Sequence, residues 1–160
     1  MQLEETLKKR RQEKDILLMT HLVLGYPSFE VNRRIIAQMV DNGVDCIEMQ
    51  IPFSEPMADG PVILKANQDS IAAGTTVAAC LEFGREMAAS YDIPFLFMTY
   101  YNIVFKYGEE RFLHAAKAAG ITVFIIPVLP LVLGGEFRTL ARVRGIAPIL
   151  IFAPTSTVAR

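Results

Sequence analysis

Hydrophobic and polar residues follow two different spacings along the chain. Five short runs are rich in β-branched, aromatic and other apolar residues, which is typical of buried strands. These runs are Ile16–Leu24, Val44–Ile51, Pro94–Met98, Thr122–Ile126 and Pro148–Phe152. A segment with helical spacing follows each of the first four runs. Strands that alternate with helices form right-handed βαβ units, so the pattern predicts an α/β fold with a parallel five-stranded sheet and outer helices.

The first connecting helix has recognisable ends. Ser28 is a suitable N-cap before the helix, and Gly43 is a suitable C-terminal cap after it. The apolar positions between them share one face of a helix and are Val31, Ile35, Ile36, Met39 and Val40. This stripe predicts a helix that packs its apolar face on the sheet.

The connection between the second and third runs is longer than the others. It begins with the loop Ile51–Pro61 (IPFSEPMADGP) and continues into an extra helix, with Pro61 at the first helical position. A second helix is predicted from near Thr76 toward Ser90. Because long connections in compact domains commonly carry function, this loop is the first place to look for a site.

The length of the chain limits how far this pattern extends. A chain of 160 residues is predicted to form a single domain over residues 1–160. A closed (β/α)8 TIM barrel takes about 200 residues or more. Five strands in this order therefore predict a partial (β/α)8 TIM barrel.

Composition excludes several classes of partner. The 16 Lys and Arg residues nearly balance the 17 Asp and Glu residues, so the weak net charge of −1 favours neither nucleic acid nor an anionic membrane surface. Hydrophobic residues make up 52% of the chain, yet no run approaches the ~18 uninterrupted apolar residues of a membrane span. The charged N-terminus lacks the apolar region of an export signal, and two cysteines, Cys46 and Cys80, fit a reduced compartment. We therefore predict a cytoplasmic protein.

Glu48 is the first candidate for chemistry. The second strand alternates two sets of side chains, Ile47, Met49 and Ile51 on one face and Cys46, Glu48 and Gln50 on the other. The apolar set suits the helix-covered face, so Glu48 points to the opposite face near the carboxyl end of a parallel strand, where ligands bind. A buried carboxyl group there suits general acid or base catalysis. The alternative is an edge glutamate that reaches water or pairs with a lysine.

Asp59 is the second candidate. It lies in the loop that follows the strand of Glu48 and directly precedes Gly60 and Pro61. One interpretation is that Asp59 or Gly60 caps the extra helix. The other is that its carboxylate accepts a hydrogen bond from a substrate N–H over the same strand ends. Two carboxylates over one mouth favour acid–base chemistry without specifying a reaction.

The remaining candidates carry less information. Tyr100 follows the third strand on the carboxyl side, where a pocket wall and an ordinary packed tyrosine are both reasonable interpretations. His21 lies in a strand and His114 in a helix, and neither belongs to a cluster of Cys, Asp or Glu with ligand spacing. We therefore predict no metal site.

At this point the sequence shows a family resemblance. The runs IEMQIPFSEPMADGPVILKANQDSIAAGTT, FLFMTYYNIVFKYGEERF, IIPVLP and FAPTST resemble the alpha subunit of tryptophan synthase, from about Leu3 to Arg160. The motif around IPFSEPMADGP is highly specific. The resemblance implies a (β/α)8 barrel that splits indole-3-glycerol phosphate into indole and glyceraldehyde 3-phosphate without a cofactor. It also implies a partner, the pyridoxal-phosphate beta subunit, which receives the indole.

The resemblance implies roles for five residues. Glu48 resembles the catalytic acid/base, and Asp59 resembles the carboxylate that holds the indole N–H. Tyr100, Met98 and His21 correspond to substrate-binding positions, although His21 stands where the family typically has an aromatic or apolar residue. Gln50 likewise replaces a small residue.

The family's phosphate-binding glycines and flexible lid belong to later strands that these 160 residues do not include. Because a phosphate anchor supplies binding energy for the chemical step, we expect the chain alone to be poorly active or inactive. One alternative is a non-catalytic scaffold, an engineered or degenerate barrel fragment. Another is one piece of a split enzyme that a separate chain completes.

Assembly is the last expectation. Five strands of a barrel leave two open sheet edges, and unpaired edges invite pairing with another chain. Apolar residues at Val128, Val132, Leu133 and Val158 add to the exposed surface. We therefore predict a homo-oligomer, most simply a two-fold dimer. The alternative is a monomer in which an N-terminal helix, Leu3–Lys14, covers the open end.

Overall fold

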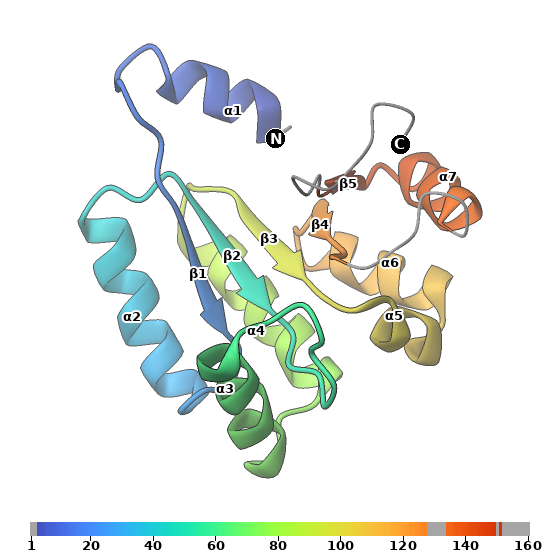
Figure 1. The fold of residues 1–160 in the computed structure, drawn as a ribbon. Coiled ribbons are helices and arrows are strands. Elements are labelled where there is room, and N and C mark those ends of the chain that lie inside the picture. The colour runs from blue at the N-terminus through green and yellow to red at the C-terminus, as the bar shows by residue number, and fades with distance from the viewer. Residues whose placement is uncertain (1–2, 128–133, 150, 152–160) are drawn as a thin grey trace.

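The fold is a five-stranded parallel sheet whose strands lie side by side in sequence order, β1-β2-β3-β4-β5 (Figure 1). A computed structural model describes residues 3–127, 134–149 and 151. Its strands are β1 (Met19–Val23), β2 (Cys46–Gln50), β3 (Phe95–Met98), β4 (Val123–Ile125) and β5 (Ala147–Ile149). All four neighbouring pairs are parallel. The prediction of a parallel five-stranded partial barrel is confirmed.

Helices connect the strands and cover one face of the sheet. They are α1 (Leu3–Arg10), α2 (Phe29–Asp41), α3 (Pro61–Ala72), α4 (Val77–Ser90), α5 (Tyr101–Tyr107), α6 (Glu109–Ala118) and α7 (Gly135–Val143). The helix α1 lies elsewhere, across the amino-terminal ends of the strands, and the strand arrows point away from it (Figure 1). No helix among the described residues is long and apolar enough to cross a membrane.

The helix ends follow the sequence signals. The Ser28 hydroxyl accepts a hydrogen bond from the Val31 N–H at 3.2 Å, and Gly43 follows α2 with a φ of +79°. A positive φ strains any residue with a Cβ, so glycine suits this position. Pro61 begins α3, and the Thr76 hydroxyl caps α4. The N-terminal helix is shorter than predicted, because α1 ends at Arg10 and a turn follows it.

The two faces of the sheet bury different sets of residues. The outer face carries Ile47, Met49 and Ile51 into the main core with side chains of α2, α4, α6 and α7. The opposite face forms a smaller cluster, called here the inner cluster, of Cys46, Leu96, Met98, Tyr100, Val123 and Ile125. Leu3 and Leu7 of α1 pack on this cluster. The alternation along β2 therefore places Glu48 and Gln50 on the inner face.

Asn32 organises the turn between β1 and α2. It is 1% exposed, and its Oδ1 accepts a hydrogen bond from the Gly25 N–H at 2.7 Å. Its Nδ2 donates to the carbonyl oxygens of Tyr26 at 2.9 Å and Val23 at 3.3 Å. One side chain thus satisfies three backbone groups of a turn that has no regular hydrogen-bond ladder.

Replacing Asn32 with alanine should destabilise the fold by about 2–4 kcal/mol, because the Gly25 N–H and the Tyr26 carbonyl oxygen lose this partner and the Val23 carbonyl oxygen keeps only the Tyr26 N–H. Chemical denaturation monitored by circular dichroism measures this change. Asn42→Ala is the matched control, since Asn42 is exposed and bonds only within its own helix end, to the Gln38 carbonyl. Equal effects of the two substitutions would contradict the role assigned to Asn32.

Candidate active site

Glu48 lies on the inner face of β2 and contacts a histidine. In the β1–β2 register its neighbour is His21, whose Nδ1 lies 2.7 Å from Glu48 Oε1. The Glu48 side chain is 13% exposed and the His21 side chain 31% exposed, so the pair is accessible from solvent. Of the two alternatives to catalysis, pairing with a lysine is not seen among the described residues. The carboxyl group that the sequence singled out instead has a partner that can itself carry a proton.

Asp59 lies on the loop after β2, above the same strand end. Its Oδ2 accepts a hydrogen bond from Gln50 Nε2 at 2.7 Å and one from the Tyr100 hydroxyl at 3.3 Å. The N-cap of α3 is Gly60, and no side chain bonds to that helix end. Of the two caps that the sequence allows, Gly60 is therefore confirmed and Asp59 is wrong. Its carboxylate faces β2 and the end of β3 instead.

Tyr100 ties the loop to the sheet. It is 2% exposed, its hydroxyl accepts a hydrogen bond from the Ala58 N–H at 3.0 Å, and its ring stacks on Phe53 with a centroid distance of 5.1 Å. Burial raises the pKa of Tyr100; the Ala58 N–H opposes this rise and Asp59 adds to it. The phenol therefore stays protonated and can donate to Asp59.

The same loop has a second anchor on α3. Asn67 is fully buried, and its Oδ1 accepts a hydrogen bond from the Phe53 N–H at 2.8 Å. Its Nδ2 donates to the Ile63 carbonyl oxygen, also at 2.8 Å. The loop that carries Asp59 is therefore fixed at Phe53 and at Ala58, on both sides of its exposed part.

The structure brings the candidate residues into two contacting groups on one face of the sheet. His21 contacts Glu48, and Tyr100 contacts Asp59 through its hydroxyl. Met98 is 6% exposed, belongs to the inner cluster and is the register partner of Gln50. Gln50 connects the two groups, because it shares the face of Glu48 and bonds Asp59. The sequence pattern placed Gln50 on this face but gave no signal for that bond.

Metal binding has no candidate in the described part of the chain. His, Cys, Asp and Glu residues there form no group of three or more that could hold a metal ion. Cys46 and Cys80 are free and buried, and burial raises the pKa of their thiols to about 11 and about 12. Both thiols therefore stay protonated at neutral pH and are poor ligands.

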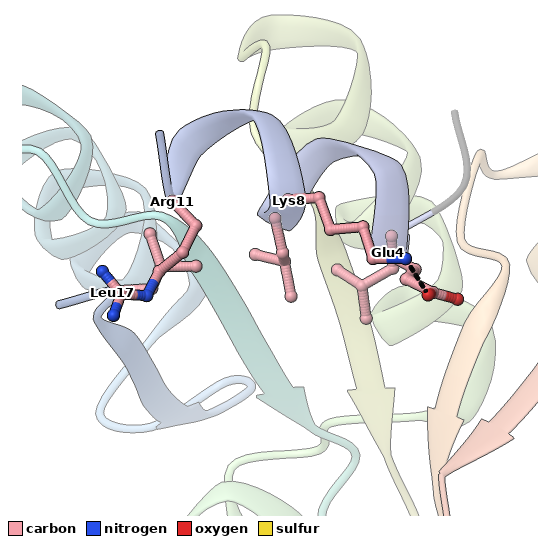
Figure 2. Close-up of a pocket in the computed structure, with 6 residues that line it drawn as sticks. Glu4, Lys8, Arg11 and Leu17 are labelled. Carbon is pink, nitrogen blue, oxygen red and sulfur yellow. Dashed lines mark ion pairs between the residues drawn. The ribbon is translucent and has the colours of Figure 1, made fainter. Parts of the chain in front are cut away.

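A groove of about 380 Å³ lies beneath α1 (Figure 2), and α1 lies at the amino-terminal ends of the strands (Figure 1). Leu3, Leu7 and Leu17 line it. Figure 2 shows Glu4 and Lys8 joined by an ion pair on α1. Glu4, Lys8 and Arg11 complete the lining. Because Glu4 is exposed and already paired with Lys8, this groove lacks the partly buried carboxyl group of the Glu48 face.

Sheet and site together define a (β/α)8-barrel type of protein, with parallel strands in sequence order, outer helices, and carboxylates near the carboxyl ends of the strands. A family model described as tryptophan synthase alpha chain matches residues 7–160. The chain belongs to this family.

Relatives and solved structures agree with that assignment. The chain is 65% identical over its whole length to the tryptophan synthase alpha chain of Desulfotalea psychrophila, and 52% identical over 99% of its length to that of Syntrophotalea carbinolica. It spans 63% and 62% of these curated relatives. The crystal structure of tryptophan synthase subunit alpha from Legionella pneumophila superposes with a TM-score of 0.92 at 28% identity, covering 98% of this chain and 60% of that one. A tryptophan synthase complex from Pyrococcus furiosus superposes with a TM-score of 0.83 at 29% identity, covering 88% and 58%.

Proposed function

We propose that this chain carries the catalytic carboxylates of a lyase that converts indole-3-glycerol phosphate to indole and glyceraldehyde 3-phosphate. One observation carries the proposal: Glu48 and the Gln50–Asp59 pair lie on the same face of β2, within a chain of the tryptophan synthase alpha family. The Glu48 side chain is partly exposed, which supports access to a ligand, and a carboxyl group in reach of a ligand can both give and take a proton.

In the proposed reaction, the Glu48 carboxyl group gives its proton to indole C3 and becomes a carboxylate. The ring then carries positive charge toward its nitrogen, where Asp59 stabilises the N–H. Glu48 next removes the proton of the side-chain hydroxyl group, and the bond between C3 and the hydroxyl-bearing carbon breaks. Its electrons return to the ring, which leaves indole and an aldehyde. Glu48 ends with the proton it began with, so the cycle needs no cofactor.

Three further residues receive supporting roles. His21 contacts Glu48 and lies next to the reacting atoms. Met98 forms an apolar wall beneath the indole ring. Tyr100 holds both Asp59 and the loop that carries it. These roles correspond to the substrate-binding positions that the resemblance implies.

Complementation tests this function directly. Indole release from indole-3-glycerol phosphate is measured for the 160-residue chain alone and with a second polypeptide. The second polypeptide carries the part of the Desulfotalea psychrophila alpha chain that this chain does not match. We expect poor or no turnover alone and a clear increase in kcat/KM on complementation, because the phosphate anchor returns.

Two outcomes would count against the proposal. A kcat/KM for the chain alone within about tenfold of a full-length relative, a difference of ~1.4 kcal/mol, would contradict the expected need for the anchor. A folded complemented assembly without indole release would contradict the lyase itself and favour the non-catalytic scaffold. Binding of a tryptophan synthase beta subunit, which the family resemblance implies, is tested by adding that subunit to the same assay.

We also propose a cytoplasmic homo-oligomer. Within the described sheet β1 is an edge strand. Ile16 and Leu18 before it and Met19 at its start are 81%, 53% and 51% exposed. Exposed edges with apolar side chains favour pairing with a second copy. The segment Val128–Leu133 and Val158, on which this expectation also rests, lie outside the described residues. Leu3 and Leu7 of α1 pack on the inner cluster, which is the contact that the monomer alternative requires.

Sedimentation at micromolar concentration decides between these states. A dimer should give a mass of twice the 17.8 kDa of one chain. Val132→Glu should dissociate the dimer if the segment Val128–Leu133 lies in the contact. A mass that stays near 17.8 kDa would contradict self-association.

A further inference from the structure

Gln50 is the enclosed neighbour of Asp59. It is the last residue of β2, it is 0% exposed, and its Nε2 donates to Asp59 Oδ2 at 2.7 Å. The other polar atom of the same amide, Oε1, is buried and has no hydrogen-bond partner in the described part of the chain. The amide nitrogen of Gln50 is therefore hydrogen-bonded, and its carbonyl oxygen is not.

The chemistry of the neighbour explains the direction of this amide. An ionised carboxylate only accepts hydrogen bonds, so Gln50 turns its NH2 group toward Asp59 and its carbonyl oxygen away from it. A buried carbonyl oxygen without a donor destabilises the fold, because water solvates that oxygen in the unfolded chain. An apolar side chain of similar shape would avoid this loss. The presence of a polar residue that lowers the stability of the fold is explained when that residue contributes to the function of the site.

The contact holds Asp59 in one orientation. The Tyr100 hydroxyl donates to the same Oδ2 at 3.3 Å, so donors from the ends of two neighbouring strands fix one oxygen of the carboxylate. Neither bond uses Oδ1. A carboxylate held in this way presents Oδ1 to a donor on a ligand without first losing rotational freedom.

We propose that Gln50 is a positioning residue, which fixes the Asp59 carboxylate for a ring N–H and lowers the stability of the fold in doing so. The inference rests on the proposed role of Asp59. It predicts two results together. Removing the amide weakens recognition of the N–H, and the fold stays as stable as before or becomes more stable. A residue with only a structural role would lower both.

Gln50→Met is the test variant, because methionine keeps the length of the side chain and removes both the donor and the unsatisfied acceptor. Calorimetry measures the Kd of the 160-residue chain for indole and for benzothiophene, which has the same shape without an N–H. We expect the Kd for indole to rise about fivefold to tenfold and the Kd for benzothiophene to change by less than about twofold. Differential scanning calorimetry should give a Tm equal to or above that of the wild type. Gln50→Leu repeats the measurement if the methionine variant does not fold.

The outcomes separate the inference from the proposed function. Asp59→Asn is measured beside Gln50→Met. If Asp59→Asn weakens indole binding and Gln50→Met does not, the positioning role fails and the role of Asp59 stands. If the wild type does not distinguish indole from benzothiophene, or Asp59→Asn changes nothing, the role of Asp59 fails and the inference fails with it. A lower Tm together with equal weakening for both probes would assign Gln50 a structural role and overturn the inference.

Discussion

Replacing Glu48 with glutamine is expected to lower kcat for indole release by about 10²- to 10⁴-fold, measured in the complemented assembly described above. Glutamine neither gives a proton to indole C3 nor removes one from the hydroxyl group at neutral pH. It does keep the shape of the side chain, and its amide, which has both a donor and an acceptor, pairs with the His21 ring in either tautomer. The KM should therefore change much less than kcat, because the substrate is still bound.

Glu55→Gln provides the matched control. Glu55 lies on the loop that carries Asp59 but is exposed, so its charge has no place in the proposed reaction. The control should retain kcat within about twofold, since most exposed substitutions act weakly. Comparable losses in the two variants would indicate a general effect of charge near the loop and would remove Glu48 from its catalytic role.

The sheet could be predicted because burial imposes a local pattern. A strand repeats every two residues, so the alternation of Cys46 with Ile47 already assigns one face to the helices. The structure agrees, since Ile47 lies in the main core and Cys46 in the inner cluster. The same period predicts that Glu48 lies on the inner face. The last predicted strand, Pro148–Phe152, agrees only in part, because β5 spans Ala147–Ile149 and Ile151 lies outside a strand.

The contacts within the site could not be predicted in the same way. The two-residue period of a strand predicts which face a residue lies on but not the register between strands. His21 contacts Glu48 only because of the β1–β2 register. Asp59 and Tyr100 are 41 positions apart, and a loop conformation brings them together. The bond between Gln50 and Asp59 likewise depends on how the loop turns back over its own strand.

Asp45→Asn should destabilise the protein by about 2–4 kcal/mol, because a buried carboxylate that two partly exposed cations and one backbone N–H share loses its charge. The Asp45 side chain is 2% exposed and accepts hydrogen bonds from Lys14 Nζ at 2.8 Å, the Leu18 N–H at 2.9 Å and Arg10 Nη1 at 3.3 Å. These contacts hold α1 and the segment after it against the start of β2. Asparagine keeps an acceptor for Leu18 but leaves both cations without a counter-charge. Chemical denaturation measures the loss, which for a chain of this size corresponds to a fall in Tm of roughly 4–16 °C.

The matched control is Asp41→Asn, since Asp41 is exposed at the end of α2. It should change stability by less than about 0.5 kcal/mol. A loss for Asp45→Asn no larger than that of the control would show that α1 is held by Leu3 and Leu7 on the inner cluster and not by charge.

The pH dependence of the same variant gives an independent check on the charge of Asp45. Burial alone raises the pKa of this carboxyl group, but the hydrogen bonds from Lys14, the Leu18 N–H and Arg10 outweigh burial, and the pKa lies below its ordinary value of 3.8. A carboxyl group with a lowered folded-state pKa stabilises the fold above its unfolded-state pKa and loses that effect as pH falls through the folded-state value. The stability difference between wild type and Asp45→Asn should therefore be constant from neutral pH down to about 5 and shrink below 3.8, as the wild-type carboxylate takes up its proton. Urea denaturation curves of both proteins between pH 7 and pH 2.5 measure this difference, and a gap that persists undiminished at the acid end would mean that asparagine disrupts packing around Asp45 instead of removing its charge.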